Sequence, residues 1–309
     1  SPPDVRERAQ AAFRKAWNYD FCFTTGLDPD FGPWRTRMGH AEYASQGSDF
    51  DTQISCPFDS PEEVLAFNPF DKLEQLDHAT LVDTANRAWK HNRQRFPEEV
   101  STVGIYNTMV SGFITMFGWD MLLLAAGTDL EAFGKLANRY ADWLLPRWHA
   151  LAECDSPIVL CHDDMVWTSG PVFNPSFYRE VIFPNYARYW APVLEAGKKL
   201  VFCSDGNYTM FVDDIARAGA QGFIMEPLTD MGYIAENYGD THFFIGNADT
   251  RILLSGTKEA IRAEVARCMD IGKDCPGFFM AVGNHIPSNT PIKNALYYNQ
   301  CYLEMAERG

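Results

Sequence analysis

Residues 199–250, KLVFCSDGNYTMFVDDIARAGAQGFIMEPLTDMGYIAENYGDTHFFIGNADT, decide the fold. Three short apolar runs of β-strand character lie in this stretch, at 199–207, 222–227 and 242–250. Amphipathic segments of helical length separate them. Strands that are joined by helices have to run parallel, because the helix carries the chain back to the same edge of the sheet. The runs are apolar almost throughout, as expected for strands that are buried on both faces.

The same alternation extends in both directions along the chain. Four further runs have the composition of strands, at 20–26, 103–109, 157–165 and 277–285. Helices are predicted at 77–96, at 174–199 and at 257–273, the last two capped by Asn174 and Thr257. Because no glycine-rich nucleotide loop follows any strand, a doubly wound nucleotide-binding sheet is disfavoured.

The predicted fold is therefore α/β, a TIM-type (β/α)8 barrel in a single domain over residues 1–309. Seven strands can be counted. The first unit is thus irregular or missing, or the eighth strand is weakly marked. A long segment at 27–76, rich in Gly, Pro and Asp with a short helix at 61–67, interrupts the alternation. It is interpreted either as a lid or partner contact, or as a structural excursion that covers the barrel.

Composition and charge exclude several classes of protein. The net charge of −15 disfavours nucleic acids and anionic membranes as partners. Apolar stretches such as 117–126 are too short for a membrane span, and the first residues are polar and helical without a signal-peptide core. The eight cysteines form no CxxC pair and several lie in apolar runs, which indicates free buried thiols in a reducing compartment. We therefore expect a cytoplasmic protein, for which a homodimer is one option.

Polar residues gather at the carboxyl ends of the strand-like runs. In a parallel barrel these ends meet at one mouth, which holds the active site. The functional interpretation is favoured for the set, although helix capping competes at any single position, for example at 205–207. The catalytic candidates are Asp163, Asp164, Asp205, Asp249 and His285, and the substrate-binding candidates are Tyr106, Asn107, His162, Asn207, Asn247, Asn284 and Arg37.

Four of the strand-end residues offer ligands for a metal. Cys203, Asp205, Glu226 and His285 together supply sulfur, oxygen and nitrogen donors for a zinc-like ion with an open position. Because neighbouring residues on a strand point to opposite faces, the three residues 162–164 cannot all enter the mouth unless the strand has ended. A nucleophilic Cys203 paired with His285 is an alternative without a supporting local motif.

Several ordered segments resemble the uroporphyrinogen-decarboxylase superfamily. GKKLVFCSDGNYTMFVDDIARAGAQGFIMEP (197–227) resembles the family segment in which a strand ends in His-Ser-Asp-Gly or His-x-Cys-Gly. YGDTHFFIGNADTRILLSGTKEAIRAEV (238–265) resembles the next unit. GFFMAVGNHIPSNTPIKNALYY (277–298) resembles the last strand and the I-P-x-x-T-P turn, and HDDMVWTSGPVFNPSFYREVIFPNY (162–186) the upstream unit. The likeness covers roughly residues 100–305.

The resemblance implies a TIM-like barrel and an activity of either of two kinds. The decarboxylases carry an arginine-rich R-Q-A-G-R-Y signature, of which WRTRMGH (34–40) is only a faint echo. In thiol-directed methyltransferases His-x-Cys and a later Cys bind zinc, whereas the matching positions here read Cys203-x-Asp205 and later Asn284 beside His285. Harder ligands make a metal more Lewis acidic, which suits activation of a methyl ether, ester or amine. It is equally consistent with carboxylates that act without a metal.

We therefore expect a methyltransferase that moves a methyl group from a small methylated substrate to a corrinoid carried by a partner protein. The second hypothesis is a decarboxylase or lyase acting on a small carboxylic acid or a tetrapyrrole, with Arg35 or Arg37 holding the carboxylate. The third is a non-enzymatic ligand-binding barrel, against which the density of polar strand ends argues.

Overall fold

The computed structural model describes residues 3–36 and 55–306. All seven predicted strands are confirmed. Six of them form one parallel sheet in the order β10-β9-β8-β7-β4-β3. Their bounds are β3 (Val103–Ile105), β4 (Ile158–His162), β7 (Lys199–Ser204), β8 (Gly222–Met225), β9 (Phe243–Ala248) and β10 (Phe278–Val282).

The first strand joins this sheet through the chain that leads into β3. Strand β1 (Phe21–Cys22) pairs in parallel with β2 (Val100–Ser101), and a single bridge from Gly26 to Gly104 continues the pairing. The rings of Phe21 in β1 and Phe279 in β10 lie 6.0 Å apart, so side chains connect the two ends of the strand series. No ladder joins these two strands within residues 3–36 and 55–306. The fold is thus a TIM-type α/β barrel with an irregular first unit.

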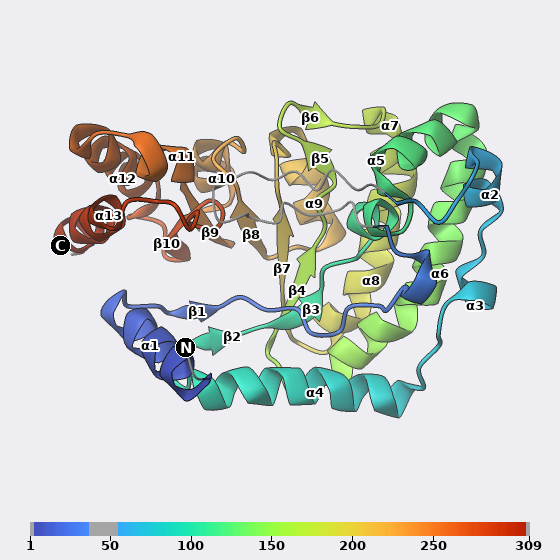
Figure 1. Ribbon diagram of the computed structural model, residues 1–309, viewed down its shortest axis with the longest axis horizontal. Helices are drawn as coiled ribbons and strands as arrows, with labels where there is room; N and C mark the ends of the chain where they lie inside the picture. The colour runs from blue at the N-terminus through green and yellow to red at the C-terminus, as the bar shows by residue number, and fades with distance from the viewer. Residues whose placement is uncertain (1–2, 37–54, 307–309) are drawn as a thin grey trace.

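Helices cover the outer faces of the strands (Figure 1). The predicted caps are confirmed, because the Asn174 side chain accepts the Ser176 N–H and the Thr257 hydroxyl accepts the Ala260 N–H. The predicted helix at 174–199 begins as α7, passes through a π-helical turn (Tyr178–Ile182) and continues as α8. The helices are α1 (Pro3–Ala16), α2 (Pro61–Ala66), α3 (Pro69–Lys72), α4 (His78–Arg95), α5 (Val110–Thr128), α6 (Leu130–Glu153), α7 (Pro175–Phe177), α8 (Phe183–Glu195), α9 (Val212–Ala218), α10 (Met231–Tyr238), α11 (Thr250–Ser255), α12 (Lys258–Gly272) and α13 (Ile292–Met305).

The described part of the segment 27–76 packs as a structural element. Phe58 and Phe67 contact Phe117 of α5, with ring centroids 5.1 and 6.1 Å apart, and Trp34 packs against Phe58 at 5.4 Å. Burying several aromatic rings in edge-to-face contact fastens this segment to the helical layer. Residues 27–36 and 55–76 thus include parts that pack against the helical layer, while residues 37–54, with Arg37, lie outside the described residues.

Helix α5 is long and apolar enough to cross a membrane by composition, yet it belongs to the core. Two thirds of its most apolar window is buried inside the fold. Its backbone is also interrupted at Gly118, where φ is 71° and ψ is 164°. Both features fit an interior helix pair of a globular fold.

The contact between β3 and β4 leaves no room for a side chain at Gly104. A Cβ atom there would lie 1.9 Å from the carbonyl oxygen of Leu160 on the paired strand. We predict that Gly104→Ala lowers the free energy of unfolding by about 3 kcal/mol or more, because backbone cannot yield as a side chain does. Gly127→Ala in α5 is the matched control, since nothing lies within 4 Å of its added Cβ. It should be neutral or stabilising by up to about 1 kcal/mol. Denaturant titration measures both, and equal midpoints would contradict the prediction.

Candidate active site

Three consecutive polar residues, His162, Asp163 and Asp164, lie at the carboxyl end of β4. Their side chains point alternately to opposite sides of the chain. Asp163 points into the core and is fully buried. Its Oδ2 accepts the backbone N–H groups of Met109 and Val110 at 2.9 and 3.1 Å and the Tyr186 hydroxyl at 2.6 Å. Its Oδ1 accepts the Ser111 N–H at 2.6 Å. Burial raises the pKa of Asp163 to about 6, and these hydrogen bonds oppose the rise. Asp163 therefore anchors the start of α5.

His162 and Asp164, on either side of Asp163, contact each other. The His162 Nε2 lies 3.1 Å from Asp164 Oδ1, which also accepts the Asp205 N–H at 2.9 Å. The Tyr106 hydroxyl donates to Asp164 Oδ2 at 2.8 Å, and the Tyr106 ring lies 4.2 Å from the His162 ring. The side chains of His162 and Asp164 are largely buried, with exposed fractions of 18% and 14%. The alternation predicted for 162–164 is thus what the structure shows.

Asp205, which follows β7, brings a second carboxylate to this pair. One ligand atom from each of His162, Asp164 and Asp205 lies within 4.8 Å of the others. Burial raises the pKa of Asp205 to about 7, and the nearby Asp164 and Glu226 carboxylates add to the rise. The carboxyl group therefore exchanges its proton near neutral pH, which suits acid or base chemistry.

Glu226, which follows β8, is tied to Asp205 through an amide. The Asn284 Nδ2 donates to Glu226 Oε1 at 2.6 Å and to Asp205 Oδ2 at 3.4 Å. Glu226 Oε2 accepts the Gly206 N–H at 2.7 Å. Gly206 has a φ of +78°, and a Cβ there would lie 2.6 Å from the Trp167 carbonyl oxygen. Trp167 belongs to the hairpin of β5 (Val166–Trp167) and β6 (Gly170–Pro171), so glycine is required where this hairpin meets the Asp205 loop.

The other two predicted metal ligands lie beside this cluster. Cys203 is buried with an exposed fraction of 6%. Burial disfavours a charged His162, but Cys203 and Asp164 beside it outweigh burial and raise the pKa of His162 well above its usual value. His285 is exposed, and its backbone N–H and Nδ1 both contact Asn284 Oδ1, at 2.7 and 3.1 Å. The compact triad thus contains one of the four ligands proposed from the sequence, Asp205.

The remaining predicted residues have structural contacts. Asp249 caps α11 by accepting the Arg251 N–H and pairs with the Arg251 guanidinium at 2.6 Å. The Asn207 side chain accepts the Thr209 N–H at 3.1 Å. The Asn247 amide is buried and donates to the carbonyl groups of Glu226 and Thr229. The Asn107 side chain accepts the Thr115 hydroxyl at 2.7 Å.

Asp28 is a mouth residue that the sequence interpretation missed. It follows β1, and its carboxylate accepts the N–H groups of Tyr106 and Asn107 and the Thr25 hydroxyl. Although part of Asp28 is exposed to solvent, desolvation by the surrounding protein raises its pKa, and the hydrogen bonds from Thr25 and Asn107 oppose the rise. The rule that selected the other sites, a polar residue just beyond a strand, applies to Asp28 as well. It was overlooked because it falls in the segment assigned to the long loop.

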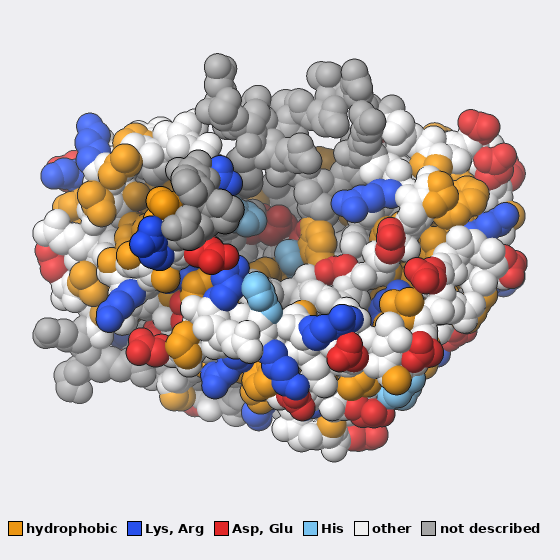
Figure 2. Space-filling view, turned by 60° about the horizontal axis from the view of Figure 1, so that its bottom comes forward, with side chains coloured by type: hydrophobic (Ala, Val, Ile, Leu, Met, Phe, Trp, Pro, Cys, Tyr) orange, Lys and Arg blue, Asp and Glu red, His pale blue; other side chains and the backbone are white. Residues whose placement is uncertain are grey.

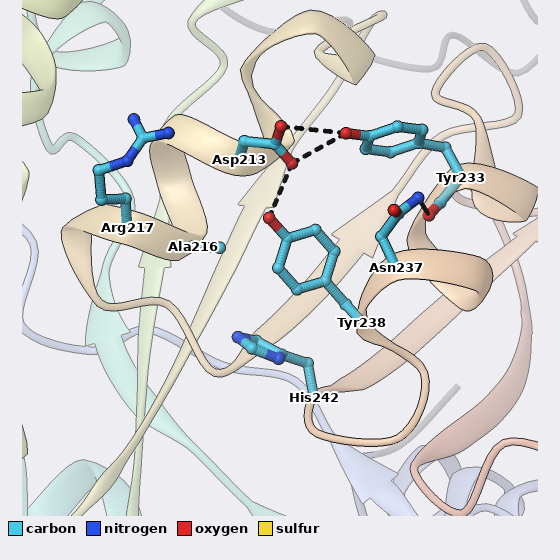
Figure 3. A pocket seen from close by; sticks show the side chains of 7 residues that line it. All are labelled: Asp213, Ala216, Arg217, Tyr233, Asn237, Tyr238 and His242. Carbon is cyan, nitrogen blue, oxygen red and sulfur yellow. Dashed lines mark hydrogen bonds between the residues drawn. The ribbon is translucent and has the colours of Figure 1, made fainter.

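Figure 2 shows a hollow in one face of the molecule, in which histidine and acidic side chains are visible. A different, shallow pocket of about 550 Å³ lies on the helical layer (Figure 3), lined by Asp213, Ala216, Arg217, Tyr233, Asn237, Tyr238 and His242. In it the hydroxyls of Tyr233 and Tyr238 donate to Asp213. These bonds fasten α10 to α9. None of the strand-end candidates lines this pocket, so we assign the chemistry to the mouth.

Comparison with known proteins defines the family. The model of the uroporphyrinogen decarboxylase (URO-D) family matches residues 48–302. The chain belongs to the URO-D family. A uroporphyrinogen decarboxylase of Geobacter sulfurreducens is 23% identical over 141 residues, which are 46% of this chain. That match spans only 41% of the Geobacter protein.

A solved structure agrees with the URO-D fold. A methyltransferase from Methanosarcina mazei superposes with a TM-score of 0.59 at 17% sequence identity. The superposition covers 84% of this chain and 74% of that protein. At this identity the similarity establishes the shared fold, and a function has to be argued from the site.

We predict that Asp163→Ala lowers the free energy of unfolding by about 3 kcal/mol or more, because it leaves buried donors of α5 and Tyr186 without an acceptor. Asp129→Ala is the matched control. Asp129 also caps a helix, accepting the Ala132 N–H, but it does so at the surface. Its loss should cost only about 1 kcal/mol. Urea unfolding compares the two variants, and an Asp163→Ala midpoint as high as that of the control would show that Asp163 is no anchor.

Proposed function

We propose that this URO-D family member is a methyltransferase that moves a methyl group from a small methylated ether, ester or amine to a corrinoid carried by a partner protein. The observation that carries the proposal is the triad of His162, Asp164 and Asp205 at the strand ends, with a proton held on Asp205 near neutral pH. When a methyl group is transferred from oxygen or nitrogen, that oxygen or nitrogen atom is the leaving group, and it is a poor one. A proton or a metal ion at that atom makes its departure easier.

Asp205 is the residue best suited to act as the acid. Among the described residues, its carboxyl group accepts only the long side-chain hydrogen bond of 3.4 Å from the Asn284 amide, so a proton on this group is available to a substrate atom. The Asp164 carboxylate is already engaged by Tyr106, His162 and the Asp205 backbone N–H. Asp164 therefore holds its neighbours in place, and Asp205 delivers the proton. We assign Glu226 and Asn284 the role of keeping the Asp205 side chain oriented.

As the alternative to a proton on Asp205, the donor set of the triad fits a metal ion, which would bind the ionised carboxylate. One imidazole nitrogen and two carboxylate oxygens within 4.8 Å of one another match the three protein ligands of a catalytic zinc site with an open position. A zinc ion held there would supply a Lewis acid for the leaving atom. In this proposal His162 and Asp164 replace Cys203, Glu226 and His285 in the set proposed from the sequence, and Asp249 and Asn247 support the adjoining loops.

The charge of the mouth supports this function over decarboxylation of a polyanionic tetrapyrrole. Asp28, Asp164, Asp205 and Glu226 bring four carboxylates to the strand ends. Arg251, which follows β9, is already paired with Asp249. An octa-anionic substrate would meet repulsion here in addition to that of the net charge of −15. The eight free cysteines fit the cytoplasmic location that we propose.

We predict that Asp205→Asn reduces methyl transfer by about 10²–10⁴-fold with the fold intact, because either the acid or, where zinc is bound, one of its three ligands is lost. The assay follows the absorbance of methylcobalamin formed from cob(I)alamin with a panel of methyl ethers, esters and amines. Cys203→Ser should have a milder effect, and Asp213→Asn in the outer pocket is the neutral control. Equal rates for Asp205→Asn and Asp213→Asn would refute the role of Asp205. Robust conversion of uroporphyrinogen to coproporphyrinogen would instead favour the decarboxylase hypothesis.

We predict that the purified protein binds one zinc ion and that His162→Ala and Asp164→Asn each abolish binding, because a site with two protein ligands is incomplete. The Cys203→Ser and His285→Ala variants should still bind one zinc ion. Equilibrium dialysis with metal analysis measures the stoichiometry. The opposite pattern, with zinc lost in Cys203→Ser and His285→Ala and retained in His162→Ala, would restore the ligand set proposed from the sequence.

A further inference from the structure

At the mouth, the side chain of Asp28 joins the chain that follows β1 to the chain that follows β3. The ladder between β1 and β2 ends at the pair Cys22 and Ser101, and beyond it a single bridge joins Gly26 to Gly104. Past this bridge the Asp28 carboxylate takes over the connection. Its Oδ1 accepts the backbone N–H of Tyr106 and, at 3.2 Å, that of Asn107.

The orientation of Asp28 is itself fixed from its own strand end. The Thr25 hydroxyl donates to Asp28 Oδ2 at 2.6 Å. Through Oδ2 the Asp28 carboxylate thus binds Thr25 in the chain after β1, and through Oδ1 it binds the backbone after β3. The charge of the carboxylate strengthens both sets of bonds, whereas a neutral amide in its place would make weaker bonds to the two N–H groups and would have to turn its nitrogen toward the Thr25 hydroxyl oxygen.

The chain that Asp28 holds carries Tyr106 to the triad. The Tyr106 ring lies 4.2 Å from the His162 ring, and its hydroxyl donates to Asp164 Oδ2. The next residue, Asn107, is held from the other side, since its carbonyl oxygen accepts the Tyr140 hydroxyl at 2.7 Å. The backbone at 106–107 is therefore fixed between Asp28 and α6, and this fixes Tyr106 over both triad residues.

We propose that Asp28 is a positioning residue of the mouth. It acts through Tyr106, setting the orientation of the His162 ring and of the Asp164 carboxylate without contacting the reacting atoms. The inference rests on the proposed function in one respect, that the triad is the reactive site. Partners of this kind typically change metal affinity or activity by about 10–100-fold when they are lost.

The test compares Asp28→Asn with Asp30→Asn. Asp30 lies two residues further along and accepts the N–H of Gly32 at 2.9 Å, so its replacement makes the same chemical change away from Tyr106. The first readout is the NMR spectrum of isotopically labelled histidines, in which a His162→Gln spectrum identifies the His162 resonances. Tyr106→Leu, which removes the neighbouring ring, sets the size of the full change. We expect Asp28→Asn to shift the His162 resonances in the same direction and Asp30→Asn to leave them unchanged.

The second readout is zinc affinity, which should fall about 10–100-fold in Asp28→Asn and stay unchanged in Asp30→Asn. Tyr106→Phe should lose a similar factor, and the double variant should be no weaker than the stronger single loss, because both changes break one chain of contacts. Losses that multiply in the double variant would overturn the proposal. Thr25→Val, which removes only the hydroxyl partner of Asp28, is the milder variant if Asp28→Asn does not fold, and it should shift the His162 resonances in the same direction.

The outcomes separate this inference from the proposed function. If the wild-type protein binds no zinc and transfers no methyl group while Asp28→Asn still shifts the His162 resonances, the proposed function fails and the positioning role stands. If the wild-type protein is active and binds zinc while Asp28→Asn matches it in spectrum and affinity, the positioning role is wrong.

Discussion

The buried carboxylate of Asp163 is the contact on which the arrangement of the mouth depends. It accepts N–H groups from the first turn of α5 and the hydroxyl of Tyr186 in α8, so it locks two helices to the end of β4. Leaving those donors unpaired in the core would be costly, which holds the Asp163 side chain inward. Because side chains alternate along the chain here, His162 and Asp164 are then both directed to the mouth. The buried carboxylate of Asp163 thereby fixes the position of the Asp164 carboxylate, which belongs to the proposed reactive site.

The mouth concentrates carboxylates, and they differ in how well they are compensated. Asp28 accepts hydrogen bonds at both oxygens, and Asp164 is held by Tyr106 and by the Asp205 N–H. Within the part of the chain that the structure describes, Asp205 receives only the long contact from Asn284, and it faces two other carboxylates. This weak compensation accompanies a pKa that burial and the neighbouring Asp164 and Glu226 carboxylates raise to about 7. The same imbalance favours a proton or a cation at this one place, which is what a leaving-group catalyst requires.

The sequence predicted the strands, their parallel direction and the gathering of polar residues at their carboxyl ends. Apolar runs and the polar residues that end them are local signals. It could not separate Asp163 from its neighbours by role, since which of three consecutive residues faces the core depends on α5 and α8, far away in the chain. The ligand set shifted for a similar reason. Cys203 and His285 have the right chemistry, but the packing places His162 and Asp164 next to Asp205 instead. Asp28 satisfies the same local rule but falls in the segment interpreted as a loop, and its partner Tyr106, 78 residues away in the chain, gives no local indication of its role.

The pairing of β4 with β7 shows how the proposed metal site could persist although the motif differs from that of the thiol-directed relatives. The resemblance to thiol-directed relatives implies a histidine at position 203 and a thiolate at position 205, where this chain has Cys203 and Asp205. His162 is the register partner of Cys203 on the adjacent strand. An imidazole therefore remains at the same level of the barrel, supplied by the neighbouring strand, and Asp164 follows two residues later as Asp205 follows Cys203. The site keeps one nitrogen donor and exchanges sulfur for oxygen. Such a donor set is less suited to a thiol and better suited to polarising an oxygen or nitrogen leaving group.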